Sequence, residues 1–374
     1  MKKVGILGGG QLGRMLLQDA ANYPVEIYVL ENDPNCPAAH LCQHFVLGNI
    51  KDYDTVLAFG RQVDVLTIEI EAVNVDALEQ LEKEGITVIP KPAVLRTIKN
   101  KITQKAFYKD NQIPSPDFVV THTLEDLQQH AHRLPAVHKV GEGGYDGKGV
   151  VVMKDEAAMA QGFDAPSVLE NMVDIAQEIA LIVAVGTDGK HVLFPPAEML
   201  FDPALNLLDY QLTPANITKE VLWKAEAIAI RLVKAFDSPG LFAVELLVDK
   251  KGEVWVNETA PRVHNSGHHT IEAHLTSQYE MLWRILLQYP LGATDMVAPS
   301  AIINLIGEPG CSGPAHYEGL EQVLGIQGAF VHIYGKADTK PGRKMGHVTV
   351  LGTDRTDLIR KAKMVKDTLK VKSL

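Results

Sequence analysis

A short segment in the first half of the chain concentrates glycine and lysine. It reads Lys139-Val140-Gly141-Glu142-Gly143-Gly144-Tyr145-Asp146-Gly147-Lys148-Gly149-Val150. Glycine amides, free of side chains, can close over phosphate oxygens, and Lys139 and Lys148 add cations beside them. The segment is not a Walker A loop, because Gly149 stands where a Ser or Thr would ligate magnesium. We predict a hairpin tip that covers phosphates; a surface hairpin without a ligand is the alternative.

Two glutamates interrupt apolar strand-like segments further along the chain. Glu245 lies within residues 242–248, and Glu258 ends the segment 254–258. A charge in such a strand costs free energy unless it is paired or bound to a metal. An antiparallel hairpin around residues 249–252 can place both carboxylates on one sheet face, with Asn257 beside them. Oxygen ligands that face a phosphate loop predict a Mg²⁺ site; two solvated strand-edge glutamates are the alternative.

A polar segment follows Glu258 directly and reads Thr259-Ala260-Pro261-Arg262-Val263-His264-Asn265-Ser266-Gly267-His268-His269. Its polarity after a buried strand predicts a site loop. No cysteine lies nearby and the histidine spacing differs from HExxH, which argues against zinc. Arg262 suits a carboxylate or phosphoryl oxygen because its guanidinium is a fixed fork. A second basic group, Lys336 with residues 340–344, is either a phosphate clamp or a solvated loop.

The N-terminal glycines Gly8, Gly10 and Gly13 have the GxGxxG spacing of a dinucleotide-binding turn, and Glu31 and Asp33 follow the next apolar segment. An NAD-dependent dehydrogenase is therefore one alternative. The pattern itself requires only a tight turn and a helix N-terminus that faces an anion. A structural turn or a contact to a substrate phosphate is favoured over NAD binding, and neither the second glycine loop nor the glutamate pair fits a dehydrogenase.

The elements that must position these residues alternate between strand and helix at the start of the chain. Strands are predicted at residues 3–7, 26–30, 63–70 and 86–89, which indicates a parallel sheet. Helices are predicted at residues 93–111, 222–236, 279–289 and 354–369. A hairpin joins residues 242–248 to 253–256, and two short strands flank the second glycine loop.

The chain has 374 residues, more than one ordinary core accommodates, so two or three domains are expected. A net charge of -10 argues against a general binder of nucleic acid or membrane surfaces. The 3 cysteines form no CxxC pair, which favours a reducing compartment. Since no apolar run has the length of a membrane span, we expect a cytoplasmic protein.

Taken together, the glycine loop, the hairpin carboxylates and the run from Asn257 to His268 resemble the N5-carboxyaminoimidazole ribonucleotide synthetases, ATPase subunits of phosphoribosylaminoimidazole carboxylase in the ATP-grasp superfamily. The resemblance extends from residues 8–15 to 341–347. It implies an ATP-grasp fold of mixed α/β and α+β class, preceded by a Rossmann-like parallel-sheet domain and followed by a small, mostly β domain. The expected bounds are residues 1–95, 96–297 with a mobile lid at about 115–172, and 298–374.

The resemblance also implies roles for individual residues. ATP would contact a set drawn from the loop, a hinge and the strands: Lys101, Lys139, Gly144, Tyr145, Asp146, Gly147, Lys148, Gly149, Val150, Glu170, Asn171, Met172, Val173, Glu178, Asn257 and Glu258. Glu245 and Glu258 would bind Mg²⁺, with Mn²⁺ as the alternative ion. The ribonucleotide would contact Gln11, Glu71, Tyr145, Asp146, Arg262, His264, Lys336 and Arg343. Catalytic roles fall to Arg262, Asp146 and Lys139.

The implied reaction is ATP- and bicarbonate-dependent carboxylation of 5-aminoimidazole ribonucleotide through carboxyphosphate, in purine synthesis. A homodimer and transfer of the product to a mutase are further implications, with no nucleic-acid or membrane partner. Other ATP-grasp carboxylate–amine ligases and a non-catalytic nucleotide-binding module are the remaining alternatives. Two positions depart from the family pattern: Phe201 stands where relatives carry histidine, and Lys101 where arginine is used.

Overall fold

The N-terminal part of the chain forms a parallel sheet covered by helices. The computed structural model describes residues 1–144, 149–201 and 208–374. The strand order is β3 (His44–Leu47), β2 (Val25–Glu31), β1 (Lys2–Leu7), β4 (Val65–Ile68) and β5 (Thr87–Val88). The helices are α1 (Gln11–Ala20), α2 (Tyr53–Gly60) and α3 (Val75–Lys83). All its strand pairs are parallel, as the alternation of strand and helix predicts.

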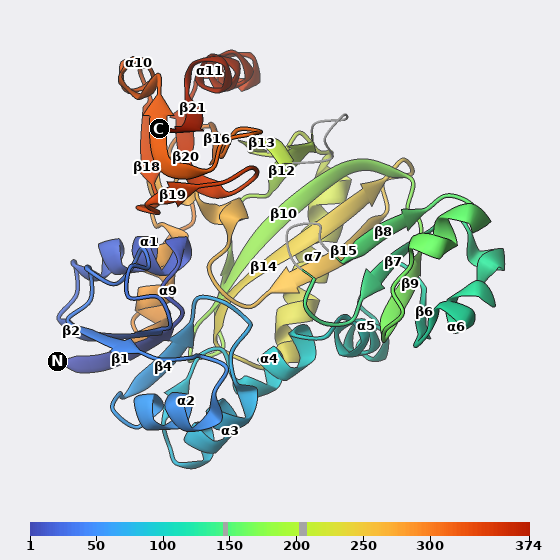
Figure 1. Ribbon diagram of the computed structural model, residues 1–374, viewed down its shortest axis with the longest axis horizontal. Helices are drawn as coiled ribbons and strands as arrows, with labels where there is room; N and C mark the ends of the chain where they lie inside the picture. The colour runs from blue at the N-terminus through green and yellow to red at the C-terminus, as the bar shows by residue number, and fades with distance from the viewer. Residues whose placement is uncertain (145–148, 202–207) are drawn as a thin grey trace.

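A nine-stranded antiparallel sheet forms the centre of the molecule (Figure 1). Its order is β15 (Val254–Ala260), β14 (Gly240–Asp249), β10 (Ile175–Val185), β12 (Ala197–Phe201), β13 (Leu208–Thr213), β16 (Ser300–Ile306), β20 (Lys344–Leu351) and β18 (Ala329–Ile333), with β11 (His191–Leu193) beside β10. Alternate side chains of β10 and β14 face α7 (Lys219–Phe236) on one side. The others face α9 (Gln278–Leu286). Glu178 and Glu245 belong to the second set by this alternation.

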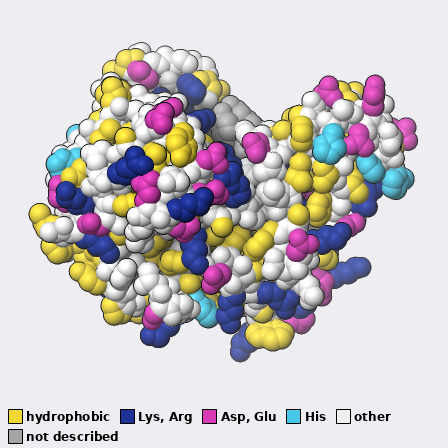
Figure 2. Space-filling model, turned by 90° about the horizontal axis from the view of Figure 1, so that it is seen from below, with side chains coloured by type: hydrophobic (Ala, Val, Ile, Leu, Met, Phe, Trp, Pro, Cys, Tyr) yellow, Lys and Arg dark blue, Asp and Glu magenta, His cyan; other side chains and the backbone are white. Residues whose placement is uncertain are grey.

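A smaller antiparallel sheet stands apart from the central one. Its order is β6 (Phe118–Thr121), β9 (Ser167–Asn171), β7 (Ala136–Val140) and β8 (Val150–Met153). Three short helices accompany it: α6 (Leu124–Gln128), η1 (Ala131–Arg133) and η2 (Glu156–Gln161). We call this unit the lid sheet. Figure 2 shows a hollow between the lobe that contains it, on the right, and the rest of the molecule.

The C-terminal part continues the central sheet, because β16 pairs with β13 and β20 pairs with β16. A second layer consists of β17 (Gly313–Glu318), β19 (Asp338–Thr339), β21 (Lys370–Ser373), α10 (Leu320–Leu324) and α11 (Arg355–Thr368). The ring of His347 on β20 stacks on His332 of β18 at 4.4 Å and on His268 at 4.5 Å. His268 follows η3 (Asn265–Gly267) and precedes α8 (Thr270–Ala273). Stacked imidazoles thus connect the C-terminal strands to the Arg262–His269 loop.

The helical pattern predicted over residues 93–111 is present, but it is divided. The structure has two helices, α4 (Pro92–Ile98) and α5 (Lys101–Asp110). Asn100 separates them, because its side chain accepts hydrogen bonds from the amides of Ile102 and Thr103 and so caps a new helix. This break directs α5, which begins at Lys101, toward the lid sheet.

The N-terminal sheet is fixed to the central sheet by helix packing. The Trp283 indole on α9 is fully buried and donates to the Leu16 carbonyl of α1 at 2.7 Å. Within the residues that the structure describes, no helix is both long and apolar enough to cross a membrane.

Arg355 on α11 forms a two-pronged ion pair with the buried Glu198 of β12, at 2.7 and 3.1 Å. Burial raises the pKa of Glu198, but the hydrogen bonds from Arg355, Asn216 and Gln177 lower it by more than burial raises it, so the net shift is downward. We expect Arg355→Met to lower the free energy of unfolding by about 1–3 kcal/mol at neutral pH, because Arg355 is partly solvated and Glu198 keeps two other donors.

A carboxylate whose pKa is lowered in the folded protein stabilises the folded state at pH values above its ordinary pKa of 4.5. This stabilisation is lost as the pH falls below that value toward the lowered pKa. The difference between wild type and Arg355→Met should therefore be full at pH 7 and shrink in acid. Urea denaturation followed by tryptophan fluorescence measures it. If the free energies of unfolding of wild type and Arg355→Met differ by the same amount at neutral and at acidic pH, this account is wrong.

Candidate active site

The hairpin of β14 and β15 brings the two predicted metal-ligand carboxylates together. Glu245 lies directly opposite Glu258, whereas Leu246 pairs with Val256, so Asn257 is an extra residue that forms a β-bulge. In a regular strand Asn257 and Glu258 would point to opposite faces, and a bulge re-aims neighbouring side chains. Both are in fact held from the lid side: Lys139 Nζ donates to Asn257 Oδ1 at 2.9 Å, and Lys101 Nζ to Glu258 Oε2 at 2.8 Å.

The two carboxylates have unequal affinities for protons. The positive charge of Lys101 lowers the pKa of Glu258, against the effect of burial. Burial raises the pKa of Glu245, and the negative charges of Glu258 and Glu178 raise it further. The pair therefore favours one shared positive charge, whether a proton or a cation. Among the residues described, no group of three or more His, Cys, Asp or Glu side chains could hold a metal. A cation here would need further ligands from a bound substrate.

Lysines from two elements converge on Glu170, the penultimate residue of β9. Its carboxylate lies 3.0 Å from Lys139 Nζ of β7 and 3.3 Å from Lys105 Nζ of α5. Burial lowers the pKa of Lys105 to about 8. Glu170 is among the residues that the sequence predicted to contact ATP, whereas Lys105 was not named. Its place one helical turn after Lys101 was the available signal.

The loop after β15 places Arg262 and His264 beside these groups. Arg262 Nε forms an ion pair with Glu71 Oε1 at 2.9 Å. His264 Nε2 lies 3.9 Å from Glu245 Oε1. Gln278 holds the loop by donating to the His264 carbonyl and accepting from the His264 amide, at 2.8 and 2.9 Å. Three predicted residues thus come from loops of different domains to one place.

The first glycine turn wraps around a carboxylate of the protein itself. Glu69 Oε1 accepts from the amides of Leu12 and Gly13, the N-terminus of α1, at 3.1 and 3.4 Å. A Cβ at Gly10 would come within 2.6 Å of this oxygen. Glu69 is 7% exposed, and burial raises its pKa although Arg262 lowers it. The anion that the motif predicts is therefore Glu69, which argues against a pyrophosphate at this turn.

Other predicted residues lie around this centre or away from it. Gln11 is the first residue of α1. Glu178 lies on β10, and burial raises its pKa. Lys336 Nζ donates to the Lys344 carbonyl at 2.7 Å, and Arg343 Nη1 to the Asp338 carbonyl at 2.8 Å. Lys344, named in the sequence only within its basic group, lies near enough to Glu245 to lower its pKa.

The glycine loop is described only at its two ends. Gly144 precedes the loop tip, and Gly149 and Val150 lead into β8. The predicted residues Tyr145, Asp146, Gly147 and Lys148 lie outside the described residues, as does the side chain of Phe201.

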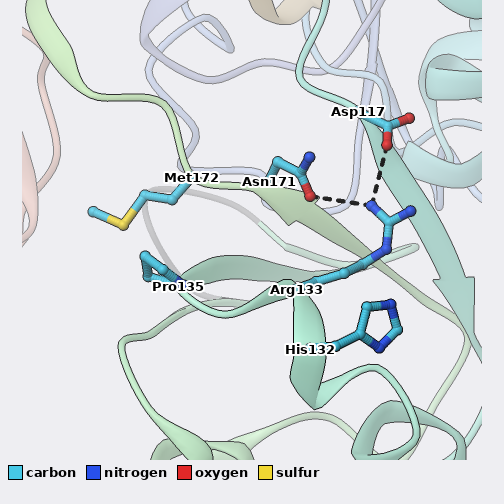
Figure 3. A pocket seen from close by; sticks show the side chains of 6 residues that line it. All are labelled: Asp117, His132, Arg133, Pro135, Asn171 and Met172. Atoms are coloured by element: carbon cyan, nitrogen blue, oxygen red, sulfur yellow. Dashed lines mark hydrogen bonds and ion pairs between the residues drawn. The ribbon is translucent and has the colours of Figure 1, made fainter.

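The predicted hinge residues Asn171 and Met172 border a recess of about 400 Å³ (Figure 3). Arg133 Nη1 donates to Asp117 Oδ2 and Asn171 Oδ1, both at 3.1 Å. Asn171 pairs with Ala136 at the start of β7, whereas Lys139 lies near its end. The hinge, with Val173 beyond it, is thus at the opposite end of the lid sheet from the glycine loop.

Three family models match consecutive parts of the chain: a ribonucleotide synthetase preATP-grasp domain at residues 1–99, an ATP-grasp domain at 106–279, and a phosphoribosylaminoimidazole carboxylase C-terminal domain at 300–361. N5-carboxyaminoimidazole ribonucleotide synthase of Aquifex aeolicus is 34% identical over 99% of this chain and 98% of its own. The chain belongs to this synthase family. The predicted family and fold are thereby confirmed.

Further members of the synthase family and longer proteins are also similar. The chloroplastic phosphoribosylaminoimidazole carboxylase of Vigna aconitifolia is 36% identical over 95% of this chain, which spans only 65% of that relative. The crystal structure of the Thermotoga maritima synthetase has a TM-score of 0.93 at 36% identity, with 100% of both chains covered. A synthase structure from Aspergillus clavatus, in complex with ADP and 5-aminoimidazole ribonucleotide, has a TM-score of 0.89 at 30% identity over 98% of each chain.

Removing the Glu69 carboxylate should loosen the first glycine turn. We expect Glu69→Ala to lower the melting temperature, since two amides at the α1 N-terminus lose a charged acceptor, a loss of roughly 1–3 kcal/mol. Acetate supplies the missing atoms and should restore part of the melting temperature, while chloride at equal ionic strength should not. Wild type measured in both salts is the control. If acetate and chloride leave the melting temperature of the variant equally unchanged, the turn does not need this carboxylate.

Proposed function

We propose that this chain uses ATP and bicarbonate to carboxylate the exocyclic amine of 5-aminoimidazole ribonucleotide, giving N5-carboxyaminoimidazole ribonucleotide, ADP and phosphate in purine synthesis. Membership of the synthase family supports the reaction. The complex of the Aspergillus clavatus relative supports the substrates. The observation that carries the proposal is the set of contacts along the hairpin: Lys101 binds Glu258 and Lys139 binds the neighbouring Asn257. His264 lies 3.9 Å from Glu245, which pairs with Glu258.

The reaction needs such a cluster because bicarbonate is a poor electrophile. Its leaving group would be hydroxide, and transfer of the γ-phosphoryl group turns that oxygen into a good leaving group. The resulting carboxyphosphate delivers the carboxyl carbon to the substrate amine. Negative charge on the transferring phosphoryl group is neutralised by Lys101 and Lys139 from the ATP side and by Arg262 from the bicarbonate side. Asp146 accepts the proton that the amine loses.

The chain's own residues would hold ATP and the ribonucleotide at opposite ends of this cluster. Residues 170–173 contact adenine through their backbone, Glu178 contacts the ribose, and the loop of residues 144–150 closes over the phosphates and excludes water. Gln11, Glu71, Tyr145 and His264 face the ribonucleotide base. Lys336 and Arg343 bind its phosphate; each donates to one backbone carbonyl in this structure, and an ammonium or guanidinium group has further N–H donors.

Magnesium fits the donor set at the hairpin. Glu245, Glu258 and the neighbouring Asn257 supply hard oxygens. Burial and the negative charges of Glu258 and Glu178 raise the pKa of Glu245, and a bound cation would offset these effects. Mg²⁺ characteristically takes its remaining ligands from nucleotide phosphates. When bound, it would supply charge neutralisation and fix the orientation of the phosphates; Mn²⁺ has similar ligand preferences.

Assembly and location belong to the same proposal. We infer a homodimer in the cytoplasm that passes its product to a mutase, without nucleic-acid or membrane partners. The three free cysteines, Cys36, Cys42 and Cys311, agree with a reducing compartment.

Phosphate release from Mg·ATP and bicarbonate tests the reaction. We expect strong stimulation by 5-aminoimidazole ribonucleotide, because the amine consumes carboxyphosphate. Arg262→Lys should lower kcat by about 10²-fold, since an ammonium cannot reproduce the guanidinium fork, and Asp146→Asn should also slow turnover. If ATP binds but the ribonucleotide leaves phosphate release unchanged, the acceptor is a different amine and the enzyme is another ATP-grasp ligase.

Loss of one hairpin carboxylate should weaken the binding of Mg²⁺. Glu245→Gln keeps the shape of the side chain but removes its charge, so half-maximal activity should need about ten times more Mg²⁺ or beyond. Glu253→Gln is the matched control, because Glu253 is exposed at the far end of the same hairpin. Titration of activity with Mg²⁺ measures the difference; equal Mg²⁺ dependence in the two variants would place the metal elsewhere.

A further inference from the structure

Lys105 is a buried cation that none of the roles above uses. It lies on α5 with 1% of its surface exposed, one helical turn after Lys101. Its Nζ lies 3.3 Å from Glu170 Oε1, and Glu170 is itself only 3% exposed. Burying a lysine and a glutamate costs desolvation energy that their attraction seldom exceeds, so such a pair is weak evidence for a purely stabilising role.

Glu170 connects both ends of the proposed ATP site. Its backbone pairs with Phe118 and Val137 within the lid sheet, and the hinge residues follow it directly. Its carboxylate is shared: Oε1 faces Lys105, and Oε2 lies 3.0 Å from Lys139 Nζ. Lys139 in turn donates to Asn257 beside the hairpin carboxylates. The contacts form one chain from α5 through β9 and β7 to β15.

The charges of Lys105, Glu170 and Lys139 together explain what Lys105 contributes. One carboxylate placed between two ammonium groups leaves a net positive charge, which is available to phosphate oxygens near Lys139. Without Lys105, the single buried negative charge of Glu170 would be balanced by Lys139 alone. Lys139 would then be held more tightly against Glu170 and would lose attraction for phosphates.

We propose that Lys105 is a positioning residue for the nucleotide: it occupies one oxygen of Glu170, and so leaves Lys139 aimed and charged for the ATP phosphates. The inference rests on the proposed ATP site. It concerns the nucleotide, because the ion pairs of Lys105 and Glu170 that the structure describes are with each other and with Lys139, and none is with a residue assigned only to the ribonucleotide.

Lys105→Met tests the proposal, because methionine fills most of the same space without charge. We expect the Kd for ADP and the KM for ATP to rise about tenfold, while the KM for 5-aminoimidazole ribonucleotide stays close to that of wild type. Lys109→Met is the matched control, since Lys109 is exposed on the same helix. Adding Glu170→Gln to Lys105→Met should restore much of the ADP affinity, because the carboxylate that captures Lys139 is then neutral.

Several results would overturn the proposal. One is an ADP affinity of Lys105→Met equal to that of Lys109→Met; another is an equal rise of KM for both substrates. Additive effects in the double variant would also show that Lys105 does not act through Glu170. If Lys105→Met fails to fold, Lys105→Arg keeps the charge and should bind ADP more tightly than Lys105→Gln. Wild-type protein that binds no ADP would instead refute the proposed function itself.

Discussion

The active site depends on one irregular pairing, the β-bulge at Asn257. In a regular hairpin Glu258 and Asn257 would point to opposite faces of the sheet. The extra residue lets Lys101 bind Glu258 while Lys139 binds Asn257, so two lysines from the lid side are anchored to adjacent residues of one strand. The lid sheet, α5 and the central sheet meet through these contacts. The positions of Glu170 and Lys105 follow from them.

Sequence alone predicted what is encoded locally. The N-terminal alternation of strands and helices, the hairpin and the two strands that flank the glycine loop each rest on patterns within a few residues, and the motif after Glu258 identified the family. The strands β10, β12 and β13 were not predicted. For β10 the physical reason is its continuous apolar run at residues 179–185, which has no polar alternation to distinguish a strand from a buried helix. Lys105 was missed because its partner Glu170 lies far away in sequence, and only the folded chain brings the two together. Lys344 was named only within its basic group, and its proximity to Glu245 likewise follows from the fold.

The continuity of the central sheet explains how distant segments share one frame. Pairing of β13 with β16 carries the sheet from the hairpin carboxylates to β20, whose first residue is Lys344. The stack of His268, His347 and His332 then ties β18 and β20 back to the loop that bears Arg262 and His264. Both ends of a substrate placed between Arg262 and Lys336 would thus be held by parts of a single scaffold.

The first glycine turn carries a lesson about what a sequence motif encodes. Its letters specify backbone amides that converge on a negative charge, but they do not specify whose charge it is. Here the charge belongs to Glu69, 57 residues from Leu12, which supplies one of the amides. The turn provides the hydrogen-bond donors, and a residue elsewhere in the sequence determines which anion they bind. The GxGxxG spacing alone therefore does not distinguish a turn that binds a cofactor phosphate from one that binds a carboxylate of the same chain.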